Sequence, residues 1–294
     1  MPEHPKQAAD GKMKATPVDE ILEREAVGAR MNRVKHKLVV LSGKGGVGKS
    51  TVAANLAIAL AKAGKRVGLL DVDIHGPSIP RLLGLDEREA TGSGDTIDPI
   101  EYDANLKVMS LGFVLRGRDD AVIWRGPLKM NVIKQFLRDV DWGDLDFLVV
   151  DCPPGTGDEP LSVVQLIGSP DGAIVVTTPQ ELAVSDVRRC VSFCRKLELP
   201  VLGVLENMSG FVCPHCGQRS DIFRSGGGEA MAADMGIRFL GRVPIDPEVV
   251  RASDEGTMYL HAHEGSETAR AFQRVVRSIM DAEELRDKPD EPAT

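Results

Sequence analysis

Short apolar runs alternate with amphipathic segments along most of the chain. The apolar runs are typical of buried strands, and the amphipathic segments are typical of helices that pack one face on a core. Strands are predicted at Lys37–Ser42, Arg66–Asp71, Leu106–Leu111, Phe147–Asp151, Ala173–Thr177, Val201–Asn207 and Arg238–Val243. Helices are predicted at Val52–Ala63, Leu128–Val140, Pro160–Ile167, Leu182–Leu197, Gly228–Met235 and Glu248–Glu255. This alternation predicts the α/β fold class, with a doubly wound, mostly parallel sheet that has helices on both faces.

The chain divides into one large domain and two polar ends. Residues 1–36 lack sustained periodicity, so we expect a mobile N-terminal arm with a short helix at Pro17–Ala29. Residues 37–280 form the expected single domain, in which the less regular stretch Asp86–Asp120 contains a β-hairpin. The acidic, proline-containing residues 281–294 predict a disordered tail.

Composition agrees with a parallel sheet and narrows the range of partners. Hydrophobic residues make up 42% of the 294 residues and aromatic residues only 4%, so valine, leucine and alanine supply a core suited to strands covered on both faces. The net charge of −8 argues against a general surface for nucleic acid and against stable association with anionic membranes. Proteins and small molecules are therefore the expected partners.

The sequence also indicates a reducing compartment. It has no apolar stretch of about eighteen residues, and its N-terminus lacks the basic-then-apolar profile of a signal peptide. We therefore expect a cytoplasmic protein. Its five cysteines should be mostly reduced, because an odd number does not close a disulfide framework.

The segment from residue 43 to residue 51 has the pattern of a phosphate-binding loop. It reads GKGGVGKST and lies between a predicted strand and a predicted helix, which is the context that such loops require. Backbone N–H groups and the positive end of the helix dipole would face the β- and γ-phosphates. Lys49 would reach the same oxygens, and the hydroxyl of Ser50 would bind Mg²⁺. The predicted nucleotide-binding residues of the loop are Gly43, Lys44, Gly45, Gly46, Val47, Gly48, Lys49, Ser50 and Thr51.

Carboxylates close two of the predicted strands near this loop. Asp71 and Asp73 follow the second strand, and Asp151 ends another apolar run. Ligands of doubly wound sheets bind beyond the carboxyl ends of the strands. An apolar run that ends in aspartate is the Walker B arrangement, so Asp151 would bind Mg²⁺ through water. Asp71 would hold the loop or bind a metal-coordinated water; the alternative is that Asp71 and Asp73 only cap the following turn.

Two prolines and two glycines follow in residues 153–157. The prolines fix the exit of the chain from the strand, whereas the glycines let the segment move when a γ-phosphate is lost, as a nucleotide switch does. Cys152, at the start of this switch segment, is expected to be a small buried residue.

A second candidate site lies in the loop at residues 207–217. Cys213 and Cys216 stand in a C-x-x-C-G pattern, which supplies half of a four-sulfur site. The other three cysteines do not complete it, because two lie on a predicted helix and one lies in the switch segment. A second copy of the chain, related by a two-fold axis, would supply the missing pair of thiolates.

Several chemistries fit a paired-cysteine loop. A thioredoxin-like redox pair normally begins a helix, whereas this pair lies in a glycine-flanked loop. Structural Zn²⁺ and an iron–sulfur cluster both take four cysteine thiolates, and spacing alone does not separate them. The sequence assigns no role beyond packing to Cys190 and Cys194 on their predicted helix.

Taken together, the motifs are far more specific than any one of them. They are GKGGVGKST, DVDIHGPSIP from Asp71, WRGP from Trp124, DCPPGTGD from Asp151 and CPHCG from Cys213. With them the chain resembles the Mrp/ApbC family of iron–sulfur cluster carrier ATPases, in the superfamily of MinD, ParA and the nitrogenase iron protein, over roughly residues 31–280. The resemblance implies an ATP-hydrolysing, Mg²⁺-dependent homodimer. Such a dimer holds a labile [4Fe–4S] cluster between paired cysteine loops, here through Cys213 and Cys216, and passes it to apoproteins.

The resemblance also implies roles for single residues. Lys44 would cross the dimer interface to the other subunit's nucleotide and neutralise charge on the transferred phosphoryl group; the alternative is a solvated lysine. Asp73 would orient and activate the attacking water. Asn207 and Pro244 would contact adenine, although an asparagine that ends a strand is otherwise an ordinary turn former.

Two other functions compete with this one. A MinD- or ParA-like positioning switch would lay the basic amphipathic segment Ser266–Met280 on a membrane, but the same pattern fits a final helix packed on the sheet. An electron-transfer reductase like the nitrogenase iron protein has cluster cysteines far apart in sequence, unlike this pair. ATP is favoured over GTP because no guanine-reading Asn-Lys-x-Asp segment occurs in the expected place.

Overall fold

A computed structural model describes residues 17–73, 76–94, 96–113, 126–213, 215–257 and 259–284. Its centre is an eight-stranded sheet with the order β12-β9-β8-β1-β7-β2-β6-β5. All neighbouring pairs are parallel except the edge pair β5 and β6, which is antiparallel. The strands are β1 Val34–Ser42, β2 Val67–Asp71, β5 Ile100–Asp103, β6 Leu106–Ser110, β7 Leu145–Asp151, β8 Gly172–Thr177, β9 Val201–Glu206 and β12 Phe239–Arg242.

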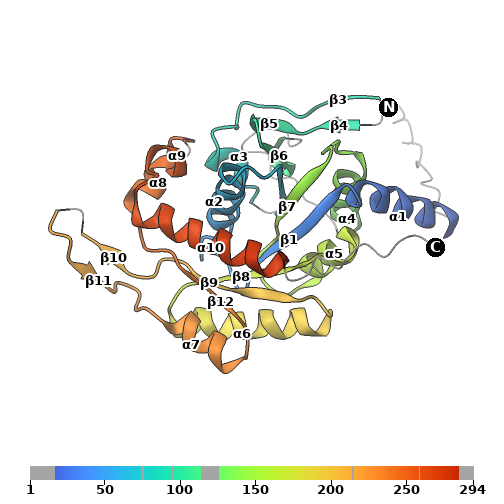
Figure 1. The fold of residues 1–294 in the computed structure, drawn as a ribbon. Helices are drawn as coiled ribbons and strands as arrows, with labels where there is room; N and C mark the ends of the chain where they lie inside the picture. Colours follow the sequence, from blue (N-terminus) through green and yellow to red (C-terminus); the bar gives the residue numbers. More distant parts are fainter. Residues whose placement is uncertain are drawn as a thin grey trace, which may run out of the picture.

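Helices cover both faces of this sheet (Figure 1). On one face α2 packs on the strands and against α10, while on the other face α1, α4 and α5 contact one another and α6 packs on β8. The helices are α1 Pro17–Met31, α2 Lys49–Lys62, α3 Ile79–Leu82, α4 Gly126–Asp139, α5 Asp158–Ile167, α6 Glu181–Lys196, α7 Gly227–Asp234, α8 Pro247–Asp254, α9 Tyr259–Ala262 and α10 Glu267–Glu284, with a 3₁₀ turn, η1, at Leu111–Phe113. The predicted doubly wound α/β fold is confirmed.

The central strands are buried on both faces. Every residue of β2 and β8 is buried, and residues 38–41 of β1 have no exposed surface. This burial explains why these strands are continuous apolar runs rather than alternating sequences. From β1 the chain crosses to β2 in one direction, and from β8 it crosses to β9 in the other. The winding therefore reverses beside β1, which is where doubly wound sheets bind their ligands.

The predicted arm over residues 1–36 needs correction from Pro17 onward. Helix α1 runs to Met31, β1 begins at Val34, and both of these residues are buried. Arg30 fixes the helix to the end of α4, because its Nε donates to the carbonyl of Arg138 at 3.1 Å. The helix buries only a narrow stripe, so its polar sequence shows little periodicity. Residues 1–16 lie outside the described residues.

The C-terminal end also differs from the prediction. Helix α10 continues through Glu284 rather than ending at residue 280, and residues 285–294 lie outside the described residues. Its apolar stripe, which includes Phe272 and Val275, is buried where α10 meets β12 and α2. The segment is thus the sheet-packed final helix and not a helix with an exposed apolar face. None of the described helices is long and apolar enough to cross a membrane.

The irregular stretch after α3 contains the predicted hairpin, formed by β3 Thr91–Ser93 and β4 Thr96–Asp98. It is followed by the antiparallel edge strand β5, which the sequence did not predict. Residues 114–125, including Trp124 of the WRGP segment, lie outside the described part of the chain.

Replacing Met31 with alanine should destabilise the fold. The side chain is 2% exposed, and truncation of such a residue lowers the free energy of unfolding by about 2–5 kcal/mol. Leu22→Ala, on the same helix at 58% exposure, should change it by no more than about 0.5 kcal/mol. Urea denaturation of both variants measures the difference. Equal, small effects would mean that α1 is not part of the folded domain.

Candidate nucleotide site and cysteine hairpin

The predicted phosphate loop joins the central strand β1 to α2. Its glycines take left-handed backbone angles where the chain turns into the helix, with φ of +79° at Gly46 and +78° at Gly48. Gly48 is the N-cap of α2 and offers no side-chain cap, and the first turn of the helix has no acidic residue. The first N–H groups of α2 therefore suit an anion, which is the fit expected for a phosphate.

Two glycines of this loop are required by close neighbours. A Cβ at Gly43 would lie 2.4 Å from the carbonyl carbon of Asp186 on α6, and a Cβ at Gly48 would lie 2.3 Å from Nδ2 of Asn207. No ordinary side chain fits at these distances. The loop is thus packed directly against α6 and against the segment that follows β9.

Lys49 brings three of the predicted catalytic residues together. Its side chain is 6% exposed, and its Nζ lies 2.6 Å from Oδ1 of Asp151 and 3.9 Å from Oδ2 of Asp73. The same ammonium donates to Oγ of Ser50 at 3.3 Å. Lys44 lies outside this cluster. Its side chain is half-buried and has no ion pair with a carboxylate in the described residues.

Asp151 has the properties of a Mg²⁺ ligand. It is fully buried, and loss of solvation raises the pKa of its carboxyl, opposed by Lys49 and by a hydrogen bond from Ser50. Its second oxygen, Oδ2, is buried without a hydrogen-bond partner among the described residues. A buried carboxylate oxygen with an open lone pair beside a serine hydroxyl fits a hard cation and its water. Ser50 and Asp151 would therefore hold Mg²⁺.

Asp71 holds the loop that carries Asp73. Its carboxylate accepts hydrogen bonds from the backbone N–H of Asp73 at 3.0 Å, the N–H of Ile79 at 3.3 Å and the hydroxyl of Ser110 at 2.9 Å. Complete burial, with the charge of Asp151 adding to it, raises the pKa of Asp71 to about 7. This geometry favours the loop-holding alternative over a metal-bound water.

The two predicted adenine residues lie in neighbouring segments. Asn207 is buried, and its Nδ2 donates to the carbonyl of Val47 in the phosphate loop at 2.9 Å. Pro244 lies in a segment that runs beside residues 209–211, because Ile245 N–H donates to Gly210 O at 2.7 Å. The Asn207 side chain is thus part of the support for the phosphate loop.

The predicted cysteine loop is a hairpin. Strands β10 Phe211–Val212 and β11 Arg219–Ser220 pair antiparallel, and the hairpin projects away from the body of the molecule (Figure 1). Cys213 is half-buried and Cys216 is exposed. Backbone N–H groups of Cys216 and His215 lower the pKa of the Cys213 thiol, which favours the thiolate that binds metals.

One chain does not complete a metal site around this pair. Within the described ranges, no three His, Cys, Asp or Glu side chains converge on a point that would hold a metal ion. Cys152 is fully buried in the core, as expected for a small buried residue, and Cys190 and Cys194 are fully buried too.

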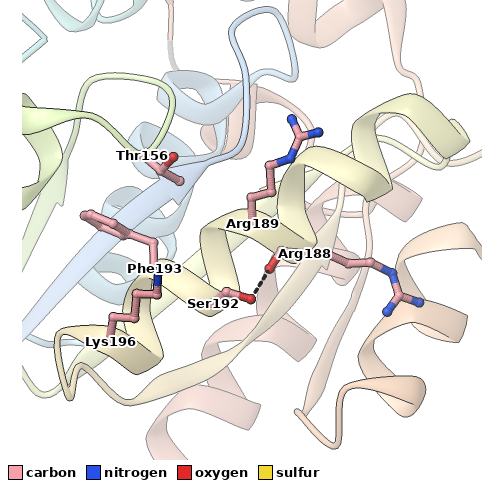
Figure 2. A pocket seen from close by; sticks show the side chains of 6 residues that line it. All are labelled: Thr156, Arg188, Arg189, Ser192, Phe193 and Lys196. Atoms are coloured by element: carbon pink, nitrogen blue, oxygen red, sulfur yellow. Dashed lines mark hydrogen bonds between the residues drawn. The ribbon is translucent and has the colours of Figure 1, made fainter.

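A separate cavity of about 410 Å³ lies beside the switch segment. Figure 2 shows Thr156 of that segment facing α6, where Phe193 and Lys196 lie, while Arg188 points away. Arg188 instead pairs with Asp234 at 2.6 Å. No residue of the phosphate loop lines this cavity, so it is distinct from the predicted nucleotide site. Its lining consists of Thr156, Arg188, Arg189, Ser192, Phe193 and Lys196.

Glu206 is a functional candidate that the sequence analysis missed. It ends β9, has no exposed surface and accepts hydrogen bonds from the N–H groups of Gly226 and Gly228. An acidic residue that closes an apolar run was the available signal, the same pattern that marks Asp71 and Asp151. Its partners lie beyond the cysteine hairpin, where no local pattern connects them to it.

Comparison with known proteins agrees with this geometry. The family model described as the ParA-type "NUBPL iron-transfer P-loop NTPase" matches residues 33–280. The chain belongs to this family. It is 48% identical over 256 residues to a "Cytosolic Fe-S cluster assembly factor NUBP2 homolog" of Nematostella vectensis, covering 86% of this chain and 95% of that protein. It is 49% identical over 252 residues to an "Iron-sulfur cluster carrier protein" of Methanocaldococcus jannaschii, covering 85% and 86%.

A solved structure shows the same fold with a nucleotide. The nucleotide-binding protein of Archaeoglobus fulgidus in complex with ADP is 41% identical and superposes with a TM-score of 0.71, covering 79% of this chain and 91% of that one. This iron-transfer P-loop NTPase thus shares its architecture with a protein that holds ADP.

Asp71 should make the fold less stable as the pH rises. Its pKa is about 7 in the folded chain against an ordinary value of 3.8, so between these values only the unfolded chain gives up the proton, and the free energy of unfolding falls across that window. In Asp71→Asn this contribution is absent. The stability of the variant relative to wild type should therefore increase from about pH 5 to about pH 8, measured by urea denaturation without nucleotide or Mg²⁺.

Asp144→Asn is the matched control for this measurement. A hydrogen bond and ion pair with Arg33 lower the pKa of Asp144, so both the folded and the unfolded chain are already ionised there above about pH 5. Its relative stability should stay constant over the same range. A constant value for Asp71→Asn as well would mean that Asp71 is ionised in the folded chain throughout.

Proposed function

We propose that this chain is an ATP-hydrolysing homodimeric carrier that binds a [4Fe–4S] cluster between two subunits and transfers it to apoproteins. The observation that carries the proposal is the pair of Cys213, which is half-buried, and Cys216, which is exposed, on a hairpin that begins beside the nucleotide loop. The described residues of the chain do not complete a ligand set around this pair. The printed names of both curated relatives, a cluster carrier and a cluster assembly factor, support the same cargo.

The nucleotide half of the proposal rests on the buried cluster around Lys49. The phosphate loop would bind the triphosphate, and Ser50 and Asp151 would hold Mg²⁺, which supplies the charge that neutralises the phosphate oxygens. Asp73, which lies 3.9 Å from Lys49 Nζ, would orient the attacking water. The ammonium of Lys49 lies next to both aspartates, and its charge opposes the loss of solvation that raises the pKa of Asp151.

The dimer half rests on what the hairpin leaves exposed. Three apolar side chains near the cysteines are exposed: Val212 by 37%, Ile222 by 57% and Phe223 by 37%. All three lie with the cysteines in the excursion between β9 and α7, residues 207–226. A second copy facing the first would bury this apolar surface and would bring four thiolates together. The half-buried Lys44 would then reach the partner's nucleotide, a position from which it stabilises charge on the transferred phosphoryl group.

The recipients are proposed to be apo iron–sulfur proteins in the cytoplasm. The Nematostella vectensis relative is named as cytosolic, and the net charge of −8 does not favour nucleic acid or anionic membranes.

Anaerobic reconstitution with iron and sulfide tests the cargo. Wild type should bind about four irons per two chains and elute as a dimer, because each chain supplies two thiolates. Cys213→Ala and Cys216→Ala should each lose the cluster, whereas Cys190→Ala, which removes a buried thiol, should retain it. Iron and sulfide counts with visible spectroscopy measure the outcome. A full cluster on a monomer, or bound zinc in place of iron, would contradict the proposal.

Mixed dimers test whether Lys44 acts on the neighbouring subunit. Lys44→Ala should bind ATP but hydrolyse it about 10³-fold more slowly, and Asp73→Asn should also be slow. When the two variants are mixed, a heterodimer contains one site with its own Asp73 and the partner's Lys44. Hydrolysis should therefore recover on mixing. If Lys44 acts within its own chain, no recovery follows, because neither site then has both residues.

A further inference from the structure

A single buried carboxylate lies at the base of the cysteine hairpin. Glu206, the last residue of β9, has no exposed surface. Its Oε1 accepts hydrogen bonds from the hydroxyl of Ser209 at 2.5 Å and from the N–H of Gly226 at 2.9 Å, and its Oε2 accepts from the N–H of Gly228 at 2.5 Å. The carboxylate is thus satisfied on both oxygens.

These donors come from both ends of the excursion that carries the cysteines. Ser209 precedes Cys213 in the chain, whereas Gly226 follows β11 and begins α7. The two ends also meet directly, because Oγ of Ser209 lies 3.2 Å from Oγ of Ser225. One side chain of the central sheet therefore holds the outgoing and the returning strand of the excursion together.

The surroundings of Glu206 are built for a charged group. The N-terminus of α7 favours negative charge, and Arg242 Nε lies 3.5 Å from Oε1. A Cβ at Gly228 would lie 2.9 Å from Cγ2 of Thr177 and 3.0 Å from Oε2 of Glu206, so a larger residue here would press on both side chains. A buried carboxylate with three donors and a nearby guanidinium is stable where an unpaired one is not.

The next residue in the chain points to the nucleotide loop. Asn207 donates through Nδ2 to Val47 O at 2.9 Å, and a Cβ at Gly48 would collide with that amide. Two consecutive side chains therefore connect the phosphate loop with both ends of the cysteine excursion. We propose that Glu206 is a positioning residue for Cys213 and Cys216, and that it lets the nucleotide state of the phosphate loop set how tightly the hairpin is held. That Cys213 and Cys216 hold a cluster rests on the proposed function. That the nucleotide state sets how tightly the hairpin is held does not.

Thiol alkylation of the iron-free protein tests this inference. Because Cys152, Cys190 and Cys194 are fully buried, iodoacetamide reports on the hairpin thiols, and mass spectrometry separates the two. In wild type, Mg²⁺ with a non-hydrolysable ATP analogue should slow alkylation of Cys213 and Cys216 by about fivefold or more, a typical size for coupling between two sites. The quantity compared is the ratio of the alkylation rate without the analogue to the rate with it. In Ser209→Ala, which releases the outgoing end but leaves the bonds to α7, this ratio should fall towards one. Affinity for the analogue should stay unchanged.

Two further variants separate positioning from general stability. Glu206→Gln should lose the nucleotide effect as Ser209→Ala does, because Gly226 and Gly228 donate to different oxygens of Glu206 and an amide places an NH2 group in one of these two positions. Glu229→Gln removes the other carboxylate that pairs with Arg242 without touching the hairpin, and it should keep the wild-type ratio.

The outcomes of this experiment are distinct from those of cluster reconstitution. The positioning role is overturned, whatever the cargo is, if the nucleotide does not slow alkylation in wild type. It is also overturned if Glu206→Gln and Ser209→Ala both fold and both keep the ratio of wild type. Failure of wild type to bind iron would overturn the proposed cargo and leave the alkylation result standing. If both hold, Ser209→Ala should also lose its cluster to a chelator at a rate that no longer responds to nucleotide.

Discussion

The burial of one lysine among carboxylates is the constraint on which the site depends. The Nζ of Lys49 lies 2.6 Å from Asp151 and 3.9 Å from Asp73, in a position that is 6% exposed. Buried charges are tolerated only when they are paired and hydrogen-bonded. The loop before α2, the end of β7 and the loop after β2 must therefore keep their relative positions for the fold to be stable. This requirement places the groups that we propose to bind phosphate and metal where the winding of the sheet reverses.

Buried carboxylates that accept hydrogen bonds recur at the carboxyl ends of the strands. Asp71 on β2, Asp151 on β7 and Glu206 on β9 each end a buried strand, and each has no exposed surface. Asp71 and Glu206 accept backbone N–H groups of the segments that follow, so each fixes a functional loop to a rigid strand. Between them, Asp151 pairs with Lys49. Parallel strands make this possible, because their carboxyl ends all lie at one edge.

Strand–helix alternation was sufficient to predict the fold class, which is confirmed. The predictions of the phosphate loop, the Walker B aspartate and the cysteine pair each rest on a few consecutive residues. The loop-holding role of Asp71 was only one of three alternatives, because it depends on Ser110, which lies 39 residues away in the chain. Helix α1 lies in the segment predicted to be an arm; among its residues 21–31, whose burial the structure describes, only Val27 and Met31 are buried, so the helix gives a weak sequence signal. The hairpin strands β10 and β11, with two residues each, are too short for any period to show.

The division of the five cysteines by burial has a chemical consequence for a protein proposed to handle iron and sulfide. Burial raises the pKa of the Cys152 thiol, next to Asp151, the proposed Mg²⁺ ligand, so that the thiol stays protonated. Cys190 and Cys194 have no surface that a metal or an oxidant could reach. Cys213 and Cys216 are therefore the two thiols of each polypeptide that iron from solution can reach.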